Sequence, residues 1–345
     1  MEDKNSELEA NISRNLRGYM ATVFENDMRS QLTNRRLSLE KAILVSPEDQ
    51  YLSGLLKEVD AALSRLDSGT FGICETCHEA IESERLAADP LIRFCIDHLT
   101  PQQQRALEQD LELAVGIQSA LLPPNDLHHG NWRTAYHFEP AGPVSGDYCD
   151  LITAMDGSFY FMLGDVSGKG VAAAMLMSHL HALFRALTSV EKSLEQMMEL
   201  ASRVFCESTL ANQYATLVCG KADSLGNIEI CNAGHLPSIV LQDNDHYYLD
   251  ANGLPLGLFC SEKFSVNRVS LKKGEFLIIL TDGLSESQDP SGVELGIESF
   301  VEKVRRHPVK SASELVKLSI KEVADYRGGG PAGDDLTLMV IERSV

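Results

Sequence analysis

Four short acidic motifs in the second half of the chain limit how it can fold. Each puts a carboxylate at the end of a run of strand-forming residues, with glycine nearby: SGDYCD, LGDVSGKG, LTDGLSE and GGGPAGDDLT. A single Asp-Gly pair is typical of a plain turn, because glycine lets the backbone turn away there. Four such motifs from distant segments instead indicate one acidic site. The motifs contain Asp147, Asp150, Asp165, Asp282, Glu286, Asp334 and Asp335.

The chemistry of such a site favours metal ions. Carboxylates gathered in one cleft repel each other and lose hydration, and hard divalent cations relieve both costs. Oxygen-only ligand sets select Mg²⁺ or Mn²⁺. Two such ions ~3.5–4 Å apart would convert a bridging water into hydroxide, which attacks a phosphomonoester in line. The motifs therefore predict a two-metal phosphomonoester hydrolase, without a covalent phosphoenzyme.

A dinucleotide site is the competing interpretation of one motif. Gly168, Gly170 and Ala173 match the G-x-G-x-x-A fingerprint. However, an acidic strand end should follow at ~20 residues to bind ribose, and Glu191 lies between two predicted helices. The Gly-Lys-Ser/Thr of a P-loop is also missing. We interpret both glycines as turn residues that lead from a metal-ligand loop into a helix.

The hydropathy pattern beyond Asn131 predicts an α+β fold. Strands are expected over 160–166, 214–222, 227–233, 275–283 and 335–343. Two helix pairs are expected over 171–187 with 194–210, and over 293–306 with 312–326. Blocks of strands with segregated helix pairs predict a β-sandwich flanked by helix pairs.

The N-terminal 66 residues are predicted to form a helical hairpin. Ser46 is a candidate N-cap and Pro47 a first-turn residue of the second helix. Its apolar residues recur in a narrow seam, which suits one partner helix; an ordinary two-helix piece of a core is the alternative. The apolar positions are Ile12, Leu16, Tyr19 and Val23 in the first helix, and Leu52, Leu56, Val59, Leu63 and Leu66 in the second.

A small zinc finger is predicted after the hairpin. Cys74-x2-Cys77 and Cys95-x2-His98 are separated by seventeen residues. Two such knuckles close a tetrahedron around Zn²⁺, and four protein ligands leave no open position, so the zinc should be structural. His78 could compete as a ligand but lies outside the two-knuckle pattern.

A helical linker is predicted over residues 100–124, between a regulatory region at 1–99 and a catalytic domain at 125–345. Thr100 is its candidate N-cap, and Pro123-Pro124 stop it. Its apolar stripe suits either a dimeric helical seam or a rigid spacer packed on its own domain. The stripe consists of Leu107, Leu111, Ala114 and Leu121.

Residues 51–98, with GTFGICETC and LIRFCIDH, resemble the DksA/TraR family. The resemblance implies a helical hairpin with a zinc finger, in a family that binds RNA polymerase. His98 stands where that family usually has cysteine. The tip at residues 45–50 lacks the family's Asp-x-x-Asp, so only the fold and the zinc are expected to transfer.

Residues from about 107 to the C-terminus resemble the PPM-type serine/threonine phosphatases of the SpoIIE/RsbU branch. The motifs occur in the family's order and include LELAVGIQSALLPP, VSGDYCD, GDVSGKGVAAAMLM, NAGHLPSIV, LTDGLSE and GDDLT. The resemblance implies a dinuclear Mn²⁺/Mg²⁺ centre in which Asp165 bridges the metals and the Val166 carbonyl joins one of them. Asp282 and Asp334 would hold the second metal, and Asp147 would position water.

The same resemblance implies a partner and a pathway. The substrates would be phosphoserine or phosphothreonine on a STAS-domain anti-sigma-factor antagonist, and the helix pair at 171–210 would control activity with input from the N-terminal module. A homodimer is expected from the helix stripes. The alternative is a DksA-like regulator that binds RNA polymerase and carries an inactive phosphatase-like domain; the intact Asp165, Asp282 and Asp334 argue against it.

Charge and cysteine content limit the remaining classes. The chain has 30 Lys and Arg against 50 Asp and Glu, a net charge of −20, which disfavours direct nucleic-acid binding. No signal peptide or apolar span is evident, so a cytoplasmic protein with no membrane partner is expected. His235 is interpreted as a structural residue, and Arg133 is a weak candidate for phosphate contact. The cysteines outside the zinc motif are interpreted as buried thiols: Cys149, Cys206, Cys219, Cys231 and Cys260.

Overall fold

The structure, a computed structural model, describes residues 26, 28–46, 48–154, 157–190, 193–210, 212–242 and 245–344. The chain divides into two compact units, residues 1–108 and 109–345. The division falls inside helix α4 (Pro101–Leu121). The predicted positions Ile12, Leu16, Tyr19, Val23 and Pro47 lie outside the described residues.

The N-terminal unit contains the predicted helical hairpin. A helix over residues 28–45 packs against α2 (Gln50–Ser68). Ion pairs join Arg29 to Asp67 at 2.7 Å and Arg36 to Asp60 at 2.9 Å, so the two helices run antiparallel. The predicted seam of the second helix is buried in part: Val59 and Leu66 are buried, whereas Leu52, Leu56 and Leu63 are only partly buried. The helix packs Val59, Ala62 and Leu66 against Leu32 and Leu39.

The N-cap of α2 differs from the prediction. Asp49, not Ser46, precedes the helix, and its carboxylate accepts the N–H groups of Tyr51 at 2.9 Å and Leu52 at 3.2 Å. A carboxylate at this position also interacts favourably with the positive end of the helix dipole. The helix ends at Gly69, whose φ of 69° is the left-handed conformation that glycine tolerates.

Helix α4 begins after Thr100, as predicted, and Thr100 forms a capping box with Gln103. The Thr100 hydroxyl accepts the N–H of Gln103 at 3.3 Å, and the Gln103 side chain accepts the N–H of Thr100 at 3.0 Å. Near its other end, the buried Gln118 side chain forms two hydrogen bonds with the backbone of Ser145, at 2.7 and 2.9 Å. Between them, Leu113 and Ile117 are exposed.

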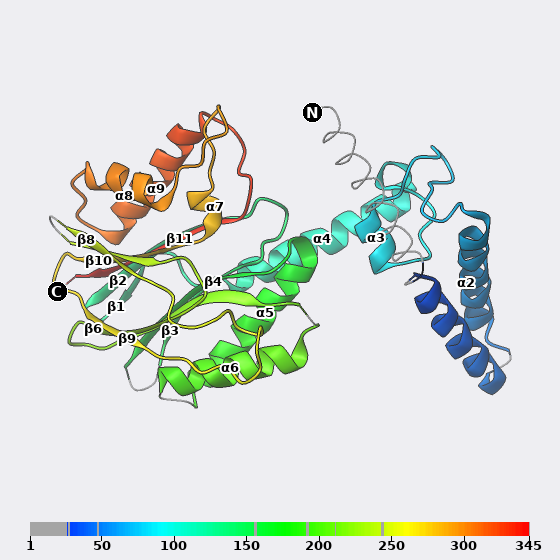
Figure 1. Ribbon diagram of the computed structural model, residues 1–345, viewed down its shortest axis with the longest axis horizontal. Helices are drawn as coiled ribbons and strands as arrows, with labels where there is room; N and C mark the ends of the chain where they lie inside the picture. Colours follow the sequence, from blue (N-terminus) through cyan, green and yellow to red (C-terminus); the bar gives the residue numbers. More distant parts are fainter. Residues whose placement is uncertain are drawn as a thin grey trace, which may run out of the picture. The chain divides into compact units, whose positions relative to one another are not determined.

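The C-terminal unit is the predicted sandwich of two antiparallel sheets between helix pairs (Figure 1). The first sheet has the order β1 (Leu127–His129), β2 (Trp132–Glu139), β11 (Leu336–Arg343), β10 (Phe276–Leu280), β7 (Ser238–Leu241) and β8 (His246–Leu249). The second has the order β3 (Asp147–Thr153), β4 (Phe159–Val166), β5 (Ala215–Ala222), β6 (Asn227–Ala233) and β9 (Asn267–Ser270).

Strand periodicity explains the layers. Alternate residues of β10 face opposite sides: Leu277 and Ile279 pack between the sheets, whereas Phe276 and Ile278 pack under the outer helices. Helices α8 (Ile297–Arg305) and α9 (Ala312–Arg327) cover the first sheet. Helices α5 (Gly170–Leu187) and α6 (Leu194–Ser208) cover the second.

Two boundaries differ from the sequence prediction. The run expected as a strand over 275–283 ends at Leu280, and a short helix α7 (Asp282–Ser285) follows. The helix expected from residue 293 begins at Ile297, because Gly296 precedes it with a φ of 69°. The other predicted helices and strands of this unit lie within a few residues of their expected positions.

One expectation about cysteine is wrong. Cys206 on α6 and Cys260 form a disulfide across 54 residues, so they are not thiols in this structure. Their Cα atoms lie 5.3 Å apart, a separation that a disulfide can span. Cys149, Cys219 and Cys231 are buried free thiols, as predicted.

Helix α5 is long and apolar enough to cross a membrane by length and composition alone. In this structure it lies on the second sheet and buries Met177, Leu180 and Phe184 against it. An apolar core helix meets the same criterion, so the observation does not indicate a membrane span.

Candidate functional site

Strand register brings the first two carboxylates of the acidic site together. Asp147 begins β3, Asp165 lies near the end of β4, and the two are direct cross-strand partners. Gly146 allows the close approach beside them, because a Cβ there would lie 3.1 Å from the carbonyl oxygen of Val166 and 3.5 Å from Asp165 Oδ1. The Val166 carbonyl therefore faces the same site as the Asp165 carboxylate.

Asp147 is buried where the two sheets meet. The hydroxyls of Thr281 and Thr337, from the first sheet's side, donate to Asp147 Oδ2 at 3.0 and 2.5 Å. Burial raises the pKa of Asp147 well above its usual value, and the charges of Asp165 and Asp335 raise it further, while the threonine hydrogen bonds oppose the shift. Sequence reasoning missed both threonines, although each lies inside an acidic motif.

The other two motifs meet through a glycine. Asp282 begins α7, directly after Thr281. A Cβ on Gly283 would overlap the carbonyl oxygen of Asp335, so only glycine allows the α7 segment to lie against the Asp334-Asp335 segment. Burial and the charge of Asp334 raise the pKa of Asp282.

The pKa of Asp165 reflects its burial near the other carboxylates of the site. Burial, followed by the charges of Asp282, Asp334 and Asp335, raises its pKa to about 7. Lys169 opposes the shift from the loop after β4, and its ammonium lies 2.7 Å from Asp334 Oδ2. The site thus concentrates carboxylates beyond what the nearby positive charge balances, which is the condition that a bound cation relieves.

The donor set fits hard divalent cations. Asp165, Asp282, Asp334 and the Val166 carbonyl offer only oxygen, which suits Mg²⁺ or Mn²⁺. These carboxylates share one site without being closely gathered: in the described part of the chain, only the zinc-motif residues place four such ligand atoms within 4.8 Å of one another.

Two acidic residues of the motifs have other partners, and a third, Glu286, has a raised pKa. Asp335 accepts the N–H groups of Ala141 at 2.7 Å and Gly146 at 2.9 Å, so it fixes the loop before Asp147. Asp150 is fully buried and held by two hydrogen bonds from Arg185 on α5, at 2.6 and 2.8 Å. Burial raises the pKa of Glu286, with a further contribution from Asp282.

His235 and Arg133 do not serve the acidic site as charges. The buried His235 ring lies 3.0 Å from the Leu280 carbonyl and 2.8 Å from the Thr216 hydroxyl. Burial lowers its pKa to about 4, so it is a neutral structural residue, as predicted. Arg133 pairs with Glu342, at the opposite end of β2 from the residues that adjoin the motifs, which excludes a phosphate contact.

The predicted zinc ligands converge. One ligand atom from each of Cys74, Cys77, Cys95 and His98 lies within 4.8 Å of the other three. Cys95 Sγ is 3.1 Å from His98 Nδ1 and 3.7 Å from Cys77 Sγ. His78 has a φ of 60° in the first knuckle and is outside this group. Three sulfurs and one imidazole nitrogen fit a tetrahedral Zn²⁺ site.

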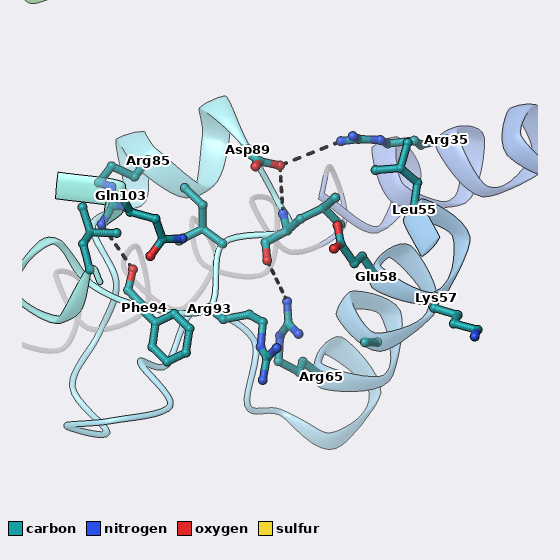
Figure 2. Close-up of a pocket in the computed structure, with 14 residues that line it drawn as sticks. Arg35, Leu55, Lys57, Glu58, Arg65, Arg85, Asp89, Arg93, Phe94 and Gln103 are labelled. Carbon is teal, nitrogen blue, oxygen red and sulfur yellow. Dashed lines mark hydrogen bonds and ion pairs between the residues drawn. The ribbon is translucent and has the colours of Figure 1, made fainter. Parts of the chain in front are cut away.

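The N-terminal unit also contains a cavity of about 620 Å³ that sequence reasoning missed (Figure 2). Its lining is rich in arginine. Two of these arginines donate hydrogen bonds to backbone carbonyls: Arg85 to that of Phe94 at 3.2 Å, and Arg65 to that of Leu91 at 3.4 Å. Arg93 forms an ion pair outside the lining with Glu75. The cavity lies within this unit and does not include the zinc ligands.

The sequence matches two known families. Residues 155–344 match Stage II sporulation protein E (SpoIIE), and residues 69–97 match the prokaryotic dksA/traR C4-type zinc finger. The second match ends just before His98, where a C4-type finger has its fourth cysteine.

Relatives and a solved structure are consistent with these matches. Protein IcfG of Synechocystis is 25% identical to this chain, in a match that covers 68% of this chain and 42% of IcfG. Phosphoserine phosphatase RsbU of Bacillus subtilis is 26% identical, in a match that covers 70% of this chain and 72% of RsbU. The chain therefore spans less than half of IcfG. The SiaA PP2C domain of Pseudomonas aeruginosa superposes with a TM-score of 0.60 over 70% of this chain and 98% of its own, at 20% identity. With more than half of its length matched and a PP2C fold in its C-terminal unit, the chain belongs to the SpoIIE family of PP2C-type phosphatases and carries a dksA/traR-type zinc finger.

Proposed function

We propose that the chain is a Mn²⁺- or Mg²⁺-dependent protein serine/threonine phosphatase. The observation that carries the proposal is the shared acidic site of Asp165, Asp282 and Asp334, three carboxylates from three segments, with pKa values of Asp165 and Asp282 raised. A structural role for these carboxylates does not account for an arrangement in which they repel one another.

The proposed mechanism assigns each residue a task. Asp165, the Val166 carbonyl, Asp282 and Asp334 would hold the two ions. When bound, the ions lower the pKa of water and neutralise charge on the phosphoryl oxygens. Asp147 orients the attacking water through Oδ1, since both threonine hydroxyls engage Oδ2.

The zinc and the partners extend this proposal. Zn²⁺ at Cys74, Cys77, Cys95 and His98 would be structural, because four protein ligands complete its shell. The substrate would be phosphoserine or phosphothreonine on a STAS-domain anti-sigma-factor antagonist, in line with the phosphoserine phosphatase RsbU among the relatives. A cytoplasmic homodimer that pairs through the α4 stripe of Leu107, Leu111, Ala114 and Leu121 completes the proposal.

Hydrolysis of a phosphoserine peptide, with and without Mn²⁺, tests the activity. Wild type should require the metal, and Asp165→Ala should lose at least about a hundredfold in kcat, as expected when a metal ligand is lost. Asp250→Ala, at an exposed position after β8, serves as the matched control and should retain full activity. Equal rates for wild type and Asp165→Ala would refute the proposal.

The zinc-finger match favours one second candidate, a regulator that binds RNA polymerase through the N-terminal unit. Binding of the full chain to purified RNA polymerase, measured alongside peptide hydrolysis, separates the two. Polymerase binding without Mn²⁺-dependent hydrolysis would favour this second candidate.

A further inference from the structure

Lys169 lies among the carboxylates of the acidic site. Its ammonium is 2.7 Å from Asp334 Oδ2, and its charge also acts on Asp165 and Asp282. The ion pair is asymmetric, since 71% of the Lys169 side chain is exposed against 34% of the Asp334 side chain. An ion pair this exposed contributes little free energy, so the ammonium can leave Asp334 at small cost.

The chain is anchored just before Lys169, whereas the Lys169 side chain is mostly exposed. Two glycines flank it, with φ of 101° at Gly168 and 70° at Gly170. Ser167 is bound to Tyr214 by two hydrogen bonds, one from each N–H, at 2.9 and 3.0 Å. Lys169 precedes α5, but its side chain does not cap the helix. The flexible four-carbon side chain on this anchored loop lets the ammonium change partners while it stays near the carboxylates.

We propose that Lys169 has two alternative partners: the Asp334 carboxylate when metal and substrate are absent, and a phosphoryl oxygen of the substrate when both are bound. This inference rests on the proposed phosphatase function. A metal ion held by Asp334 would compete with the Lys169 ammonium for the same carboxylate, so metal binding would favour release of the ammonium. A phosphate dianion placed among so many carboxylates then attracts the released cation, as lysines bind phosphate in other sites.

Two binding measurements on the full chain test both halves of the proposal. Mn²⁺ titration without substrate should give a dissociation constant about two- to fivefold lower for Lys169→Met than for wild type, since a weak competing ion pair is removed. Titration of the Mn²⁺-loaded protein with inorganic phosphate should give a dissociation constant about tenfold higher, because a charge-assisted hydrogen bond is lost. Lys169→Arg should retain phosphate affinity.

Lys263→Met is the matched control. Lys263 is 81% exposed and pairs with Glu199 at 2.6 Å. The variant therefore loses a similar surface ion pair, at a position that does not border the acidic site. Neither affinity should change in this variant. An unchanged Mn²⁺ or phosphate affinity in Lys169→Met would overturn the inference. Failure of wild type to hydrolyse phosphopeptide would contradict only the proposed function, because both titrations measure binding.

Discussion

Asp335 illustrates how one residue of a paired motif differs from its neighbour. Asp334 faces Lys169 and the other carboxylates, whereas both oxygens of Asp335 accept backbone N–H groups of the loop before Asp147. Adjacent aspartates thus have separate roles, one in the proposed metal site and one in positioning the loop. Sequence alone does not reveal which aspartate has which role, because the partners of Asp335 lie 194 and 189 residues away in the chain and come close only in the fold.

Asp335→Asn should show this positioning role. The amide retains one acceptor oxygen but places a donor opposite the second N–H, so one hydrogen bond is lost and the loop loosens, at about 1–3 kcal/mol. We expect kcat to fall about tenfold, while the Mn²⁺ dissociation constant changes by less than about threefold. A large loss of Mn²⁺ affinity would show instead that Asp335 is a metal ligand.

The raised pKa of Asp165 predicts a pH-dependent stability in the metal-free protein. Its value is about 7 in the folded state, against an ordinary value of about 3.9 in an unfolded chain. Between these values the folded state holds a proton that the unfolded state has released. The free energy of unfolding should therefore fall as pH rises from about 4 to 7, and level off above that range.

Urea denaturation without metal at pH 5 and pH 8 measures this effect. Asp165→Asn removes one titrating group, so the loss of stability between the two pH values should be smaller than in wild type. The dependence should not vanish, because the pKa values of Asp147 and Asp282 are also raised. The same loss in both proteins would contradict the assignment.

At the scale of elements, α7 depends on Gly283. Its Cα lies against the backbone of the Asp335 segment, where a side chain would overlap the Asp335 carbonyl. Gly283→Ala should destabilise the protein by about 1–3 kcal/mol, the usual cost of overpacking, and displace Asp282 from the site. Thermal melting and peptide hydrolysis measure the two effects.

Gly116 on α4 provides the contrast for this prediction. A Cβ there would meet no atom within 4 Å, and alanine favours a helix more than glycine does. Gly116→Ala should leave activity unchanged and stabilise the protein slightly. Similar losses in both glycine variants would show that the close approach at Gly283 is unimportant.

Long apolar runs made most elements of the C-terminal unit predictable. Strands β4 and β10 are buried along almost their whole length, and their sequences FYFMLGDV and FLIIL are mostly apolar. Short or polar strands were missed, such as β9 (NRVS) at a sheet edge. Helix α8 begins later than expected, at Ile297, because Gly296 before it has a non-helical backbone conformation. The spacing of apolar residues along the sequence does not reveal that conformation.

The acidic site was predictable in its residues but not in its connections. The acidic motifs identify Asp147, Asp165, Asp282 and Asp334 from sequence, but the expected place at a strand end is correct for only two of them. Asp165 lies near the end of β4 and Asp282 follows β10, whereas Asp147 begins β3 and Asp334 precedes β11. The hydrogen bonds of Thr281 and Thr337 depend on the register between two sheets, and the Lys169 ion pair joins segments 165 residues apart. The Cys206–Cys260 disulfide was missed for the same reason.

For the whole molecule, the division into two units predicts separable responses to metal removal. The zinc motif lies in residues 1–108 and the acidic site in 109–345. Cys95→Ser should unfold the zinc-finger region, since small zinc modules depend on their metal. With excess Mn²⁺, peptide hydrolysis should remain within about threefold of wild type, equivalent to less than about 0.7 kcal/mol.

Zinc content, near-ultraviolet circular dichroism and hydrolysis of a phosphoserine peptide measure this separation on the full chain. Ser64→Ala, an exposed change in the same unit, is a suitable control because it removes only a local hydrogen bond to the Asp60 carbonyl. Complete loss of hydrolysis in Cys95→Ser would show that the units are energetically coupled.

The contact between Gln118 and Ser145 connects helix α4 to the segment that contains Asp147. Gln118 satisfies both backbone groups of Ser145, and the Ser145 hydroxyl accepts the N–H of Asp147 at 3.0 Å. If α4 rotated or slid by one residue, these buried groups would lose their partners, at about 1–3 kcal/mol for each one. The orientation of the Gln118 amide thus makes the position of Asp147, the carboxylate proposed to orient water, sensitive to torque on α4.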